Sequence, residues 1–421
     1  MASKANEDPN KICGTGVSVD MIERVIAEKC GVPEAKITKW TAEDIAAGKG
    51  FLSVMAQMEL SWSVKNAKLP TKIVAKIPTS TKLPMLKDFM GEEFLEKVKS
   101  DLHIIHNCEV SVYEMFAKDP TMPVCIPNVY GTMRLPEGGE GVEPAYIIMD
   151  DLSAKAGLVN FTKGMTLNEK QATQVATNLA YLHAWSTFHK DLTSKLIFMD
   201  LMKAFQDASK SSKAGMDTVQ ALFRQEENKG YITEEQIKRV PELKIEVEDM
   251  MLLTHMHKDG DYEGFEDVLV HGDMHTNNLM FQLDENGEPN GDLVAVLDWQ
   301  IVHPGNPCED LTRLLFAVNE EYRTPEYQTK LLHDYYDAYE QEVTRQGQKE
   351  MPFTFATLDA LFQKSSDLML RQFMPMMPNF VKTLESGSIP GVDVAKVKKE
   401  FMNNFSQMIT TALEKLDREK K

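Results

Sequence analysis

The segment from Val268 to Phe281, VLVHGDMHTNNLMF, constrains the fold more than any other part of the 421-residue sequence. Its first three residues predict a short buried strand, and the apolar run that begins at Leu279 predicts a second strand after a polar loop. The turn DENGEPNGD that follows contains Asn-Gly pairs, which predicts a hairpin whose second strand ends at Asp298. Because short buried strands fix the loops between them, we expect the polar side chains of this stretch to lie close together.

Asp273, Asn278 and Asp298 are the polar residues of this stretch whose types match phosphoryl transfer. That reaction needs one carboxylate to orient the acceptor hydroxyl and take its proton. It also needs an amide oxygen and a second carboxylate to hold Mg²⁺ on the nucleotide phosphates. Asp273 is therefore the predicted base, and Asn278 and Asp298 are the predicted metal ligands. Each residue alone is more often a turn former or a strand-end cap, but the ordered set favours function.

The first third of the chain predicts a mixture of strands and helices. Residues 54–62 (VMAQMELSW) alternate between apolar and mostly polar residues, which is typical of a half-buried strand. Residues 71–77 (TKIVAKI) are rich in β-branched side chains and complete an antiparallel hairpin. Residues 146–149 (YIIM) predict a further strand, and helical patterns occur at 19–28 and 102–118.

Beyond residue 152 the pattern becomes mostly helical. Thr166-Leu-Asn-Glu169 matches a capping box that opens an amphipathic helix. Residues 191–265 predict further helices joined by a polar loop at 209–215. After the short strands described above, helices are expected from Asp310 to the end of the chain.

The paired motifs HGDMHTNN and VLDWQ resemble those of the aminoglycoside-phosphotransferase and choline-kinase superfamily. They are most similar to its ecdysteroid-kinase-like (CHK kinase-like) branch, and above all to the nematode members of that branch. The resemblance implies an α+β fold of the bilobal protein-kinase-like kind. A small β-rich N-lobe would span residues 1–150 and bind the nucleotide, and a larger, mostly helical C-lobe would span residues 151–421.

A kinase-like fold also requires a lysine on the third strand, a glutamate on the next helix and a glycine-rich loop. Lys76 in IVAKI occupies the position of the kinase lysine, and Glu109 matches the family pattern, with Glu114 as the alternative. The segment GKGFLS precedes the hairpin as a shortened glycine loop, and MDDL fits the hinge that meets adenine. The predicted residues for binding ATP are Gly48, Lys49, Gly50, Ser53, Lys76, Glu109, Met149, Asp150, Asp151 and Leu152. By the same resemblance, His271 and Asp310 would support the catalytic loop without doing chemistry.

The acceptor is expected to be a small molecule. Only eleven residues, WQIVHPGNPCE, separate Asp298 from Asp310, which is too short for the activation segment on which protein kinases bind a peptide. A steroid-like, glycosidic or other alcohol is predicted, with Trp299, Gln300, His303 and residues 191–265 as candidate pocket walls.

Two alternatives stay open. A choline or ethanolamine kinase would use cation–π contacts, and Tyr335, Tyr336 and Tyr339 beside Asp334 and Asp337 could supply them. However, an ordinary amphipathic helix explains the same pattern, and DWQ departs from the choline-kinase sequence. The other alternative is a pseudokinase that acts as a scaffold, against which the full set of lysine, base and metal ligands argues.

The net charge restricts the partners. The chain has 46 Lys and Arg against 64 Asp and Glu, a formal charge of -18, which disfavours nucleic acid and anionic membranes. No secretory signal and no apolar run of membrane-spanning length is present, and the five cysteines form no CxxC pair. A cytoplasmic protein without membrane partners is therefore expected. The sequence does not indicate its oligomeric state.

Overall fold

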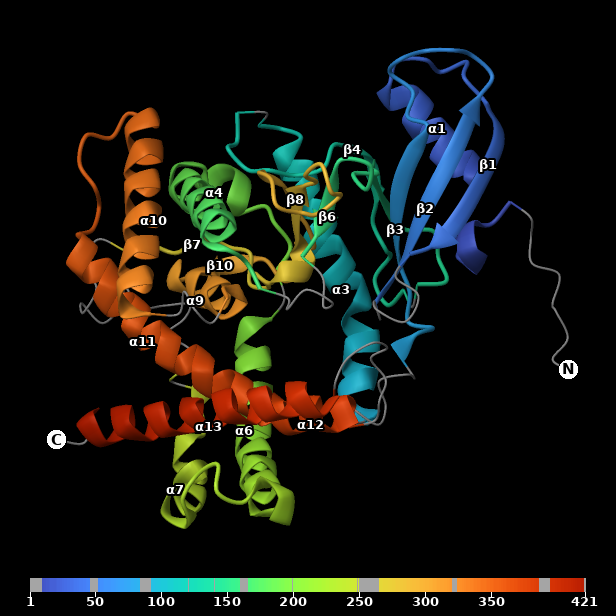
Figure 1. Cartoon of the computed structure of the whole chain (residues 1–421). Helices are drawn as coiled ribbons and strands as arrows, with labels where there is room; N and C mark the ends of the chain where they lie inside the picture. The colour runs from blue at the N-terminus through green and yellow to red at the C-terminus, as the bar shows by residue number, and fades with distance from the viewer. Residues whose placement is uncertain are drawn as a thin grey trace, which may run out of the picture. The chain divides into compact units, whose positions relative to one another are not determined.

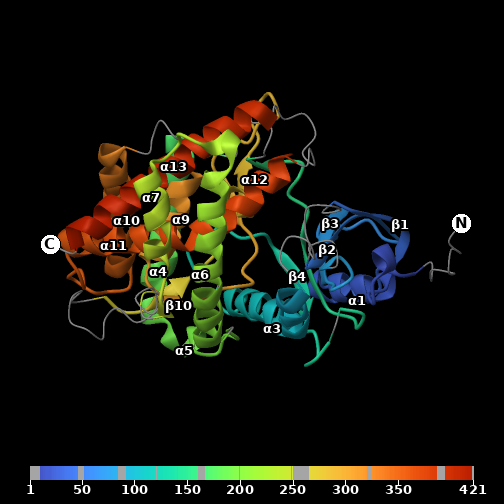
Figure 2. The ribbon, with the colours of Figure 1, turned by 90° about the horizontal axis from the view of Figure 1, so that it is seen from below.

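The protein is described by a computed structural model (Figures 1 and 2). The structure describes residues 10–45, 52–83, 92–119, 121–139, 141–159, 166–198, 200–247, 249, 265–319, 324–385 and 394–419. The chain divides into two compact units. The first unit comprises residues 1–158, 189–199 and 277–302, and the second comprises 159–188, 200–276 and 303–421. Residues 277–302 thus belong to the same unit as the N-terminal strands.

A five-stranded antiparallel sheet forms the centre of the first unit, with the strand order β1-β2-β3-β5-β4. Its strands are β1 (Ile37–Asp44), β2 (Ser53–Trp62), β3 (Lys72–Pro78), β4 (Val129–Met133) and β5 (Tyr146–Asp150). The alternation in β2 sets the packing: Val54, Ala56, Met58 and Leu60 are all buried, and the residues between them are not. These side chains pack against Ile22 and Ile26 of helix α1 (Val19–Lys29).

Helix α3 (Glu92–Phe116) also belongs to the first unit and lies beside β4 (Figure 2). His106 bonds the carbonyl of Met133 at 2.9 Å, and the amide of Asn107 donates to the carbonyl of Leu135 at 2.8 Å. A short sheet, β6-β8-β9, completes this unit with strands β6 (Ala156–Leu158), β8 (Leu279–Gln282) and β9 (Leu293–Val296). Helix α5 (Lys190–Thr193) belongs to it too.

The second unit is mostly helical. Its only described strands are β7 (Val268–Val270) and β10 (His303–Gly305), which pair antiparallel. Its longer helices are α4 (Glu169–Phe188), α6 (Leu201–Arg224), α7 (Glu234–Arg239), α9 (Cys308–Ala317), α10 (Pro325–Arg345), α11 (Phe355–Phe373), α12 (Met377–Glu385) and α13 (Val394–Glu419). Helices α4 and α10 pack along each other, and a second core joins α6, α7 and α13 around Phe223 and Phe405 (Figure 1).

The α+β class predicted from the sequence is confirmed, with a β-rich N-terminal region and a helical C-terminal region. The predicted strands at 54–62, 71–77 and 146–149 correspond to β2, β3 and β5. No helix in the described ranges is long and apolar enough to span a membrane.

Two local predictions were wrong. The capping box of α4 is formed by Asn168 and Gln171, whose side chains each accept a bond from the other's backbone N–H, at 3.0 Å in both directions. The expected Thr166–Glu169 pair fails because the helix begins at Glu169, so the N-cap lies two residues later than Thr166. The polar loop expected at 209–215 is instead part of α6. Position 215 of this helix requires glycine, because a Cβ atom there would lie only 2.2 Å from the side chain of Pro375.

Candidate active site

The predicted site residues fall in both units. The first unit holds Lys76, Glu109, Asn278 and Asp298. The second unit holds His271, Asp273 and Asp310.

A buried lysine joins two carboxylates in the first unit. The Nζ atom of Lys76 lies 2.5 Å from Oε2 of Glu109 and 2.6 Å from Oδ1 of Asp298. Lys76 is 8% exposed and Glu109 is 1% exposed. The strand period explains this direction: Ala75 and Ile77 enter the core beside α1, so Lys76 projects from the opposite face of the sheet.

The geometry distinguishes between the two candidate glutamates. Glu109 meets Lys76, whereas Glu114 lies on the surface and accepts a bond from Arg134 at 2.7 Å. The two glutamates are five positions apart on α3, so they cannot share one face of the helix. Glu109 is therefore the partner of the lysine.

The electrostatics of this cluster keep the lysine charged. Burial alone would lower the pKa of Lys76, but the charges of Asp298 and Glu109 outweigh burial and raise it above its usual value. Burial raises the pKa of Glu109 to about 7, against the lowering effect of Lys76. Two carboxylates beside one ammonium group leave the ionised cluster with a net negative charge, which suits it to hold a cation as well.

Asp298 has an unusual backbone. Its φ is +65°, in the left-handed region that residues other than glycine rarely adopt. The next residue, Trp299, anchors the turn: it is 1% exposed and meets Phe116 of α3 edge-on, with ring centroids 5.1 Å apart. Its indole N–H donates to the carbonyl of Val296 at 3.2 Å. A strained backbone held by a buried aromatic residue is typical of functional positions.

Asn278 lies beside the same turn. It ends the short 3-10 helix Thr276–Asn278, it is 4% exposed, and its carbonyl accepts a bond from the N–H of Leu297 at 2.8 Å. Leu297 immediately precedes Asp298, so β8 and β9 bring the two predicted metal ligands to the same end of the hairpin.

The donor set of this hairpin end fits Mg²⁺. Among the described residues, Lys76 is the sole hydrogen-bonding partner of the Asp298 carboxylate, and it engages Oδ1. The second oxygen is thus left for a cation, and Asn278 adds an amide, a hard oxygen ligand. No group of three or more His, Cys, Asp or Glu side chains in the described part of the chain could hold a metal ion. Magnesium would therefore depend on further oxygen atoms from phosphates and water, as is usual for Mg²⁺ on nucleotides.

A buried aspartate braces the HGD loop in the second unit. Asp310 on α9 is fully buried, and its carboxylate accepts bonds from the backbone N–H groups of His271 at 2.7 Å and Gly272 at 2.9 Å. Gly272 has a φ of +81°, which a residue with a side chain would adopt only under strain. Burial would raise the pKa of Asp310, but its hydrogen bond from His183 and nearby positive charge lower it below the usual value.

The sequence did not indicate that His183 and Tyr335 belong to this network. His183 on α4 lies 3.3 Å from Oδ2 of Asp310 through Nε2 and 2.9 Å from the hydroxyl of Tyr335 through Nδ1. All three side chains are fully buried. His183 thus connects the Asp310 carboxylate through Nε2 to the tyrosine hydroxyl through Nδ1. In the sequence, His183 falls on the apolar stripe of α4, and this pattern predicts a core residue rather than a hydrogen-bonding partner of Asp310.

Asp273 is kept ionised by its surroundings. Its backbone N–H donates to Nδ1 of His271 at 3.2 Å, and its carboxylate lies 3.3 Å from Nε2 of His275. Burial would raise the pKa of Asp273, but the hydrogen bond and charge of His275, followed by Arg313 and His271, lower it below its usual value. An ionised carboxylate on a braced loop can accept a proton.

The predicted hinge residues are held by side-chain bonds within the first unit. Asp150 accepts from the hydroxyl of Tyr130 at 2.6 Å, and Asp151 accepts from the amide of Gln57 at 2.9 Å. Two others of the set, Met149 and Leu152, are buried. Both carboxylates of this segment are therefore anchored within the first unit.

The predicted glycine loop is described only at its end. Gly48, Lys49 and Gly50 lie outside the described residues. Ser53 begins β2, and its carbonyl accepts a bond from Nζ of Lys82 at 3.0 Å.

The candidate acceptor residues are mostly core residues. Tyr335 and Tyr339 are buried, and the hydroxyl of Tyr336 donates to the carbonyl of Phe353 at 3.1 Å. Trp299 is buried against Phe116, as described above, and His303 is buried and paired with Glu309 at 3.0 Å. The tyrosine pattern of α10 thus reflects packing of an amphipathic helix, as the sequence favoured. Trp299 and His303 each make buried contacts of their own, with Phe116 and Glu309 respectively.

Comparison with known proteins connects the chain to one curated relative. It is 27% identical over 321 residues to the Caenorhabditis elegans protein named "Uncharacterized oxidoreductase dhs-27". The match covers 71% of this chain but only 35% of the relative, so the chain spans about a third of the length of the protein it matches.

Solved structures of small-molecule phosphotransferases are also similar. The choline kinase of Cryptosporidium parvum Iowa II is 13% identical, with 94% of this chain and 97% of that chain covered and a TM-score of 0.47. The macrolide 2'-phosphotransferase MphH of Brachybacterium faecium is 14% identical, with coverage of 91% and 98% and a TM-score of 0.43. The ADP-bound aminoglycoside phosphotransferase APH(2'')-Ib is 15% identical, with coverage of 93% and 99% and a TM-score of 0.42. Similarity at this level transfers no activity.

The family model is decisive because it spans nearly the whole chain. The model DUF1679, described as "Uncharacterized oxidoreductase dhs-27", matches residues 6–417. The chain therefore belongs to the DUF1679 family.

Proposed function

We propose that the chain is a kinase that transfers the γ-phosphoryl group of ATP to a hydroxyl of a small molecule. The observation that carries the proposal is the buried contact of Lys76 with Glu109 and Asp298, three residues that the sequence selected for this chemistry from distant segments. The braced, ionised Asp273 adds the base that such a reaction needs.

Each residue has a defined part in the reaction. Asp273 orients the acceptor hydroxyl and takes its proton as the new bond forms between the acceptor oxygen and the γ-phosphorus. The bond between that phosphorus and the β–γ bridging oxygen breaks, and ADP leaves. Lys76, held by Glu109, neutralises phosphate oxygens. Asn278 and Asp298 would hold Mg²⁺, which supplies further positive charge for the phosphates.

The predicted acceptor class remains a steroid-like, glycosidic or other alcohol. Choline or ethanolamine is the weaker alternative, because the tyrosines of α10 that could have formed a cation site pack with the core. We further propose that the protein acts in the cytoplasm and that residues 1–150 supply most of the nucleotide site.

The relative's name raises the alternative of an oxidoreductase. The sequence of this chain contains no G-x-G-x-x-G fingerprint, the loop by which dinucleotide cofactors are commonly held. Since the match covers 35% of the relative, the name extends over a much longer protein than the part matched here. The kinase residues described above favour phosphoryl transfer for this chain.

The test is ADP release by the purified protein with Mg²⁺, ATP and fractionated metabolite extracts. Wild-type protein should consume ATP with at least one fraction, and Asp273→Asn should lower kcat by about 100-fold or more, the usual range for loss of a general base. Asp217→Asn is the matched control, since Asp217 is exposed on α6. Equal turnover by Asp273→Asn would exclude Asp273 as the base. Binding of Mg²⁺-ATP without turnover in any fraction would favour the pseudokinase.

A further inference from the structure

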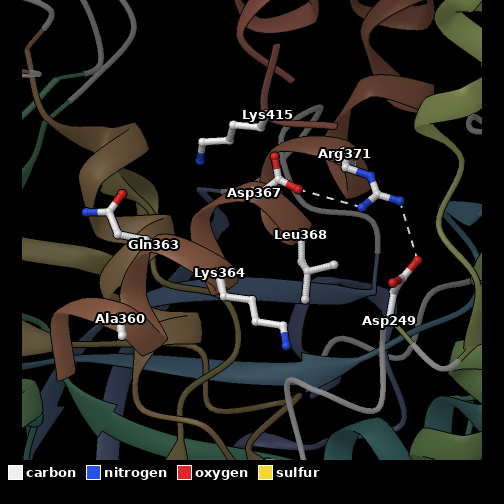
Figure 3. A pocket seen from close by; sticks show the side chains of 8 residues that line it. All are labelled: Asp249, Ala360, Gln363, Lys364, Asp367, Leu368, Arg371 and Lys415. Atoms are coloured by element: carbon white, nitrogen blue, oxygen red, sulfur yellow. Dashed lines mark hydrogen bonds and ion pairs between the residues drawn. The ribbon is translucent and has the colours of Figure 1, made fainter. Parts of the chain in front are cut away.

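A cavity of about 450 Å³ lies in the second unit, away from every residue assigned above. It is lined by one stripe of α11, by Lys415 of α13 and by Asp249 (Figure 3). The stripe consists of Ala360, Gln363, Lys364, Asp367, Leu368 and Arg371. These positions recur every three or four residues, so they form a single face of the helix, and the volume is in the range of small-molecule sites.

Arg371 builds the wall of this cavity. Its guanidinium donates to the carbonyls of Leu243 at 3.2 Å and Lys244 at 2.6 Å, and it lies 3.4 Å from Asp249 and 3.6 Å from Asp367. Four partners on three segments fix this side chain, so Arg371 positions the two aspartates rather than serving as a mobile ligand contact (Figure 3).

Asp367 retains an unused acceptor. The residue is 9% exposed, and Oδ2 faces Arg371. The other oxygen, Oδ1, is buried and has no hydrogen-bond partner among the described residues. In Figure 3 this oxygen is turned away from Arg371. A buried carboxylate oxygen without a donor is costly, and in native proteins an ordered water, an ion or another bound group is one way in which such an atom is satisfied.

The ammonium group of Lys415 lines the same cavity. Within the ranges that the structure describes, no acidic side chain pairs with Lys415. Lys364 also lines the cavity, and in Figure 3 the two lysines are drawn on opposite sides of Asp367. Three cations against two aspartates give the cavity a net positive charge in a chain whose net charge is -18. A local reversal of the field favours an anionic ligand.

We propose that this cavity binds a small hydroxylated anion, either a phosphate monoester or a carboxylate. The anionic group would lie between Lys364 and Lys415, and a hydroxyl of the ligand would donate to the Asp367 carboxylate. Leu368 and Ala360 provide apolar surface for the carbon skeleton. This site is independent of the proposed phosphotransfer, since none of its residues belongs to the ATP, metal or base positions.

The experiment is isothermal titration of the full chain, without nucleotide, with five probes. Glucose 6-phosphate and gluconate carry both features, ethyl phosphate and acetate carry the anion without a carbon-bound hydroxyl, and glucose carries hydroxyls without the anion. At least one of the first two should bind, about tenfold or more tighter than its plain counterpart, and glucose should not bind. Comparing glucose 6-phosphate with gluconate separates the phosphate source from the carboxylate source.

Lys415→Glu should weaken binding of the successful probe by about tenfold or more, because it replaces attraction by repulsion. Lys399→Glu makes the same charge change at an exposed position of α13 outside the cavity and should leave binding unchanged. Melting curves without probe confirm that both variants fold. The proposal fails if neither hydroxylated anion binds, if ethyl phosphate and acetate bind equally well, or if Lys415→Glu binds like Lys399→Glu.

Discussion

Replacing Lys76 by Met should destabilise the first unit in a pH-dependent way. The substitution keeps the length of the apolar stem but removes the ammonium group that Glu109 and Asp298 share. Loss of one partner of a buried ion pair costs about 3–5 kcal/mol, because the other charge stays buried and uncompensated. Glu109 is 1% exposed, so it bears that cost, whereas the Asp298 side chain is 29% exposed and can be hydrated.

The pH dependence follows from Glu109. Burial raises its pKa to about 7, whereas an unfolded glutamate titrates near about 4.3. A raised folded-state pKa in an acid means that the folded protein binds the proton more strongly. The penalty of the buried charge is therefore absent below about pH 4, grows as pH rises towards 7 and is complete above it. The value of about 7 already includes the lowering effect of Lys76, so removing the lysine raises the pKa of Glu109 further and enlarges the penalty at high pH. Lys76→Met should therefore be strongly destabilising at pH 8 and much milder at pH 5.

Urea unfolding followed by tryptophan fluorescence measures this effect, because Trp40, Trp62 and Trp299 report on the first unit. Lys72→Met is the matched control: the same change on the same strand removes only an exposed pair with Glu59 and should alter little. Adding Glu109→Gln to Lys76→Met should restore most of the stability lost at pH 8. Equal destabilisation at pH 8 and pH 5, or no rescue by the second substitution, would refute the reasoning.

Two further predictions concern the HGD loop. Asp310→Asn should destabilise the second unit by about 2–4 kcal/mol, because an amide N–H would face the backbone donors of His271 or Gly272. It should also lower kcat with little change in the affinity for Mg²⁺-ATP. A variant with the unfolding free energy and turnover of the wild type would contradict this prediction. His275→Ala should move the acid limb of the kcat/KM profile to higher pH, because the group that most lowers the pKa of Asp273 is lost while burial continues to raise it. An unchanged acid limb would show that another group is titrating.

The local features of this chain were readable from its sequence because they depend on neighbouring residues. The alternation of apolar and polar residues predicted which face of β2 is buried. The order of HGD, Asn278 and Asp298 along the sequence indicated the candidate site. Lys76 was identified because its neighbours in β3 are apolar. A lysine between residues that are buried on both sides of it is unlikely to be an ordinary surface residue.

The features that were missed depend on distant contacts. Glu109 and Glu114 lie on different sides of α3, and tertiary packing decides which of these sides faces Lys76 on the sheet. His183 and Tyr335 are 152 positions apart, and each fits the apolar stripe of its own helix, so neither sequence pattern indicates a shared hydrogen bond. Residues 209–215 lie within α6, where Gly215 leaves room for the distant residue Pro375, and the polar composition of the segment could not show this contact.

The central claim is transfer of a phosphoryl group to a small-molecule hydroxyl. Its most direct test is incubation of the protein with metabolite extract and ATP labelled with heavy oxygen on the γ-phosphate, followed by mass spectrometry. The account predicts a labelled phosphate ester that wild-type protein forms and that neither Asp273→Asn nor Asp298→Asn forms. It would be contradicted if wild-type protein left the label in ATP, or released it only as inorganic phosphate.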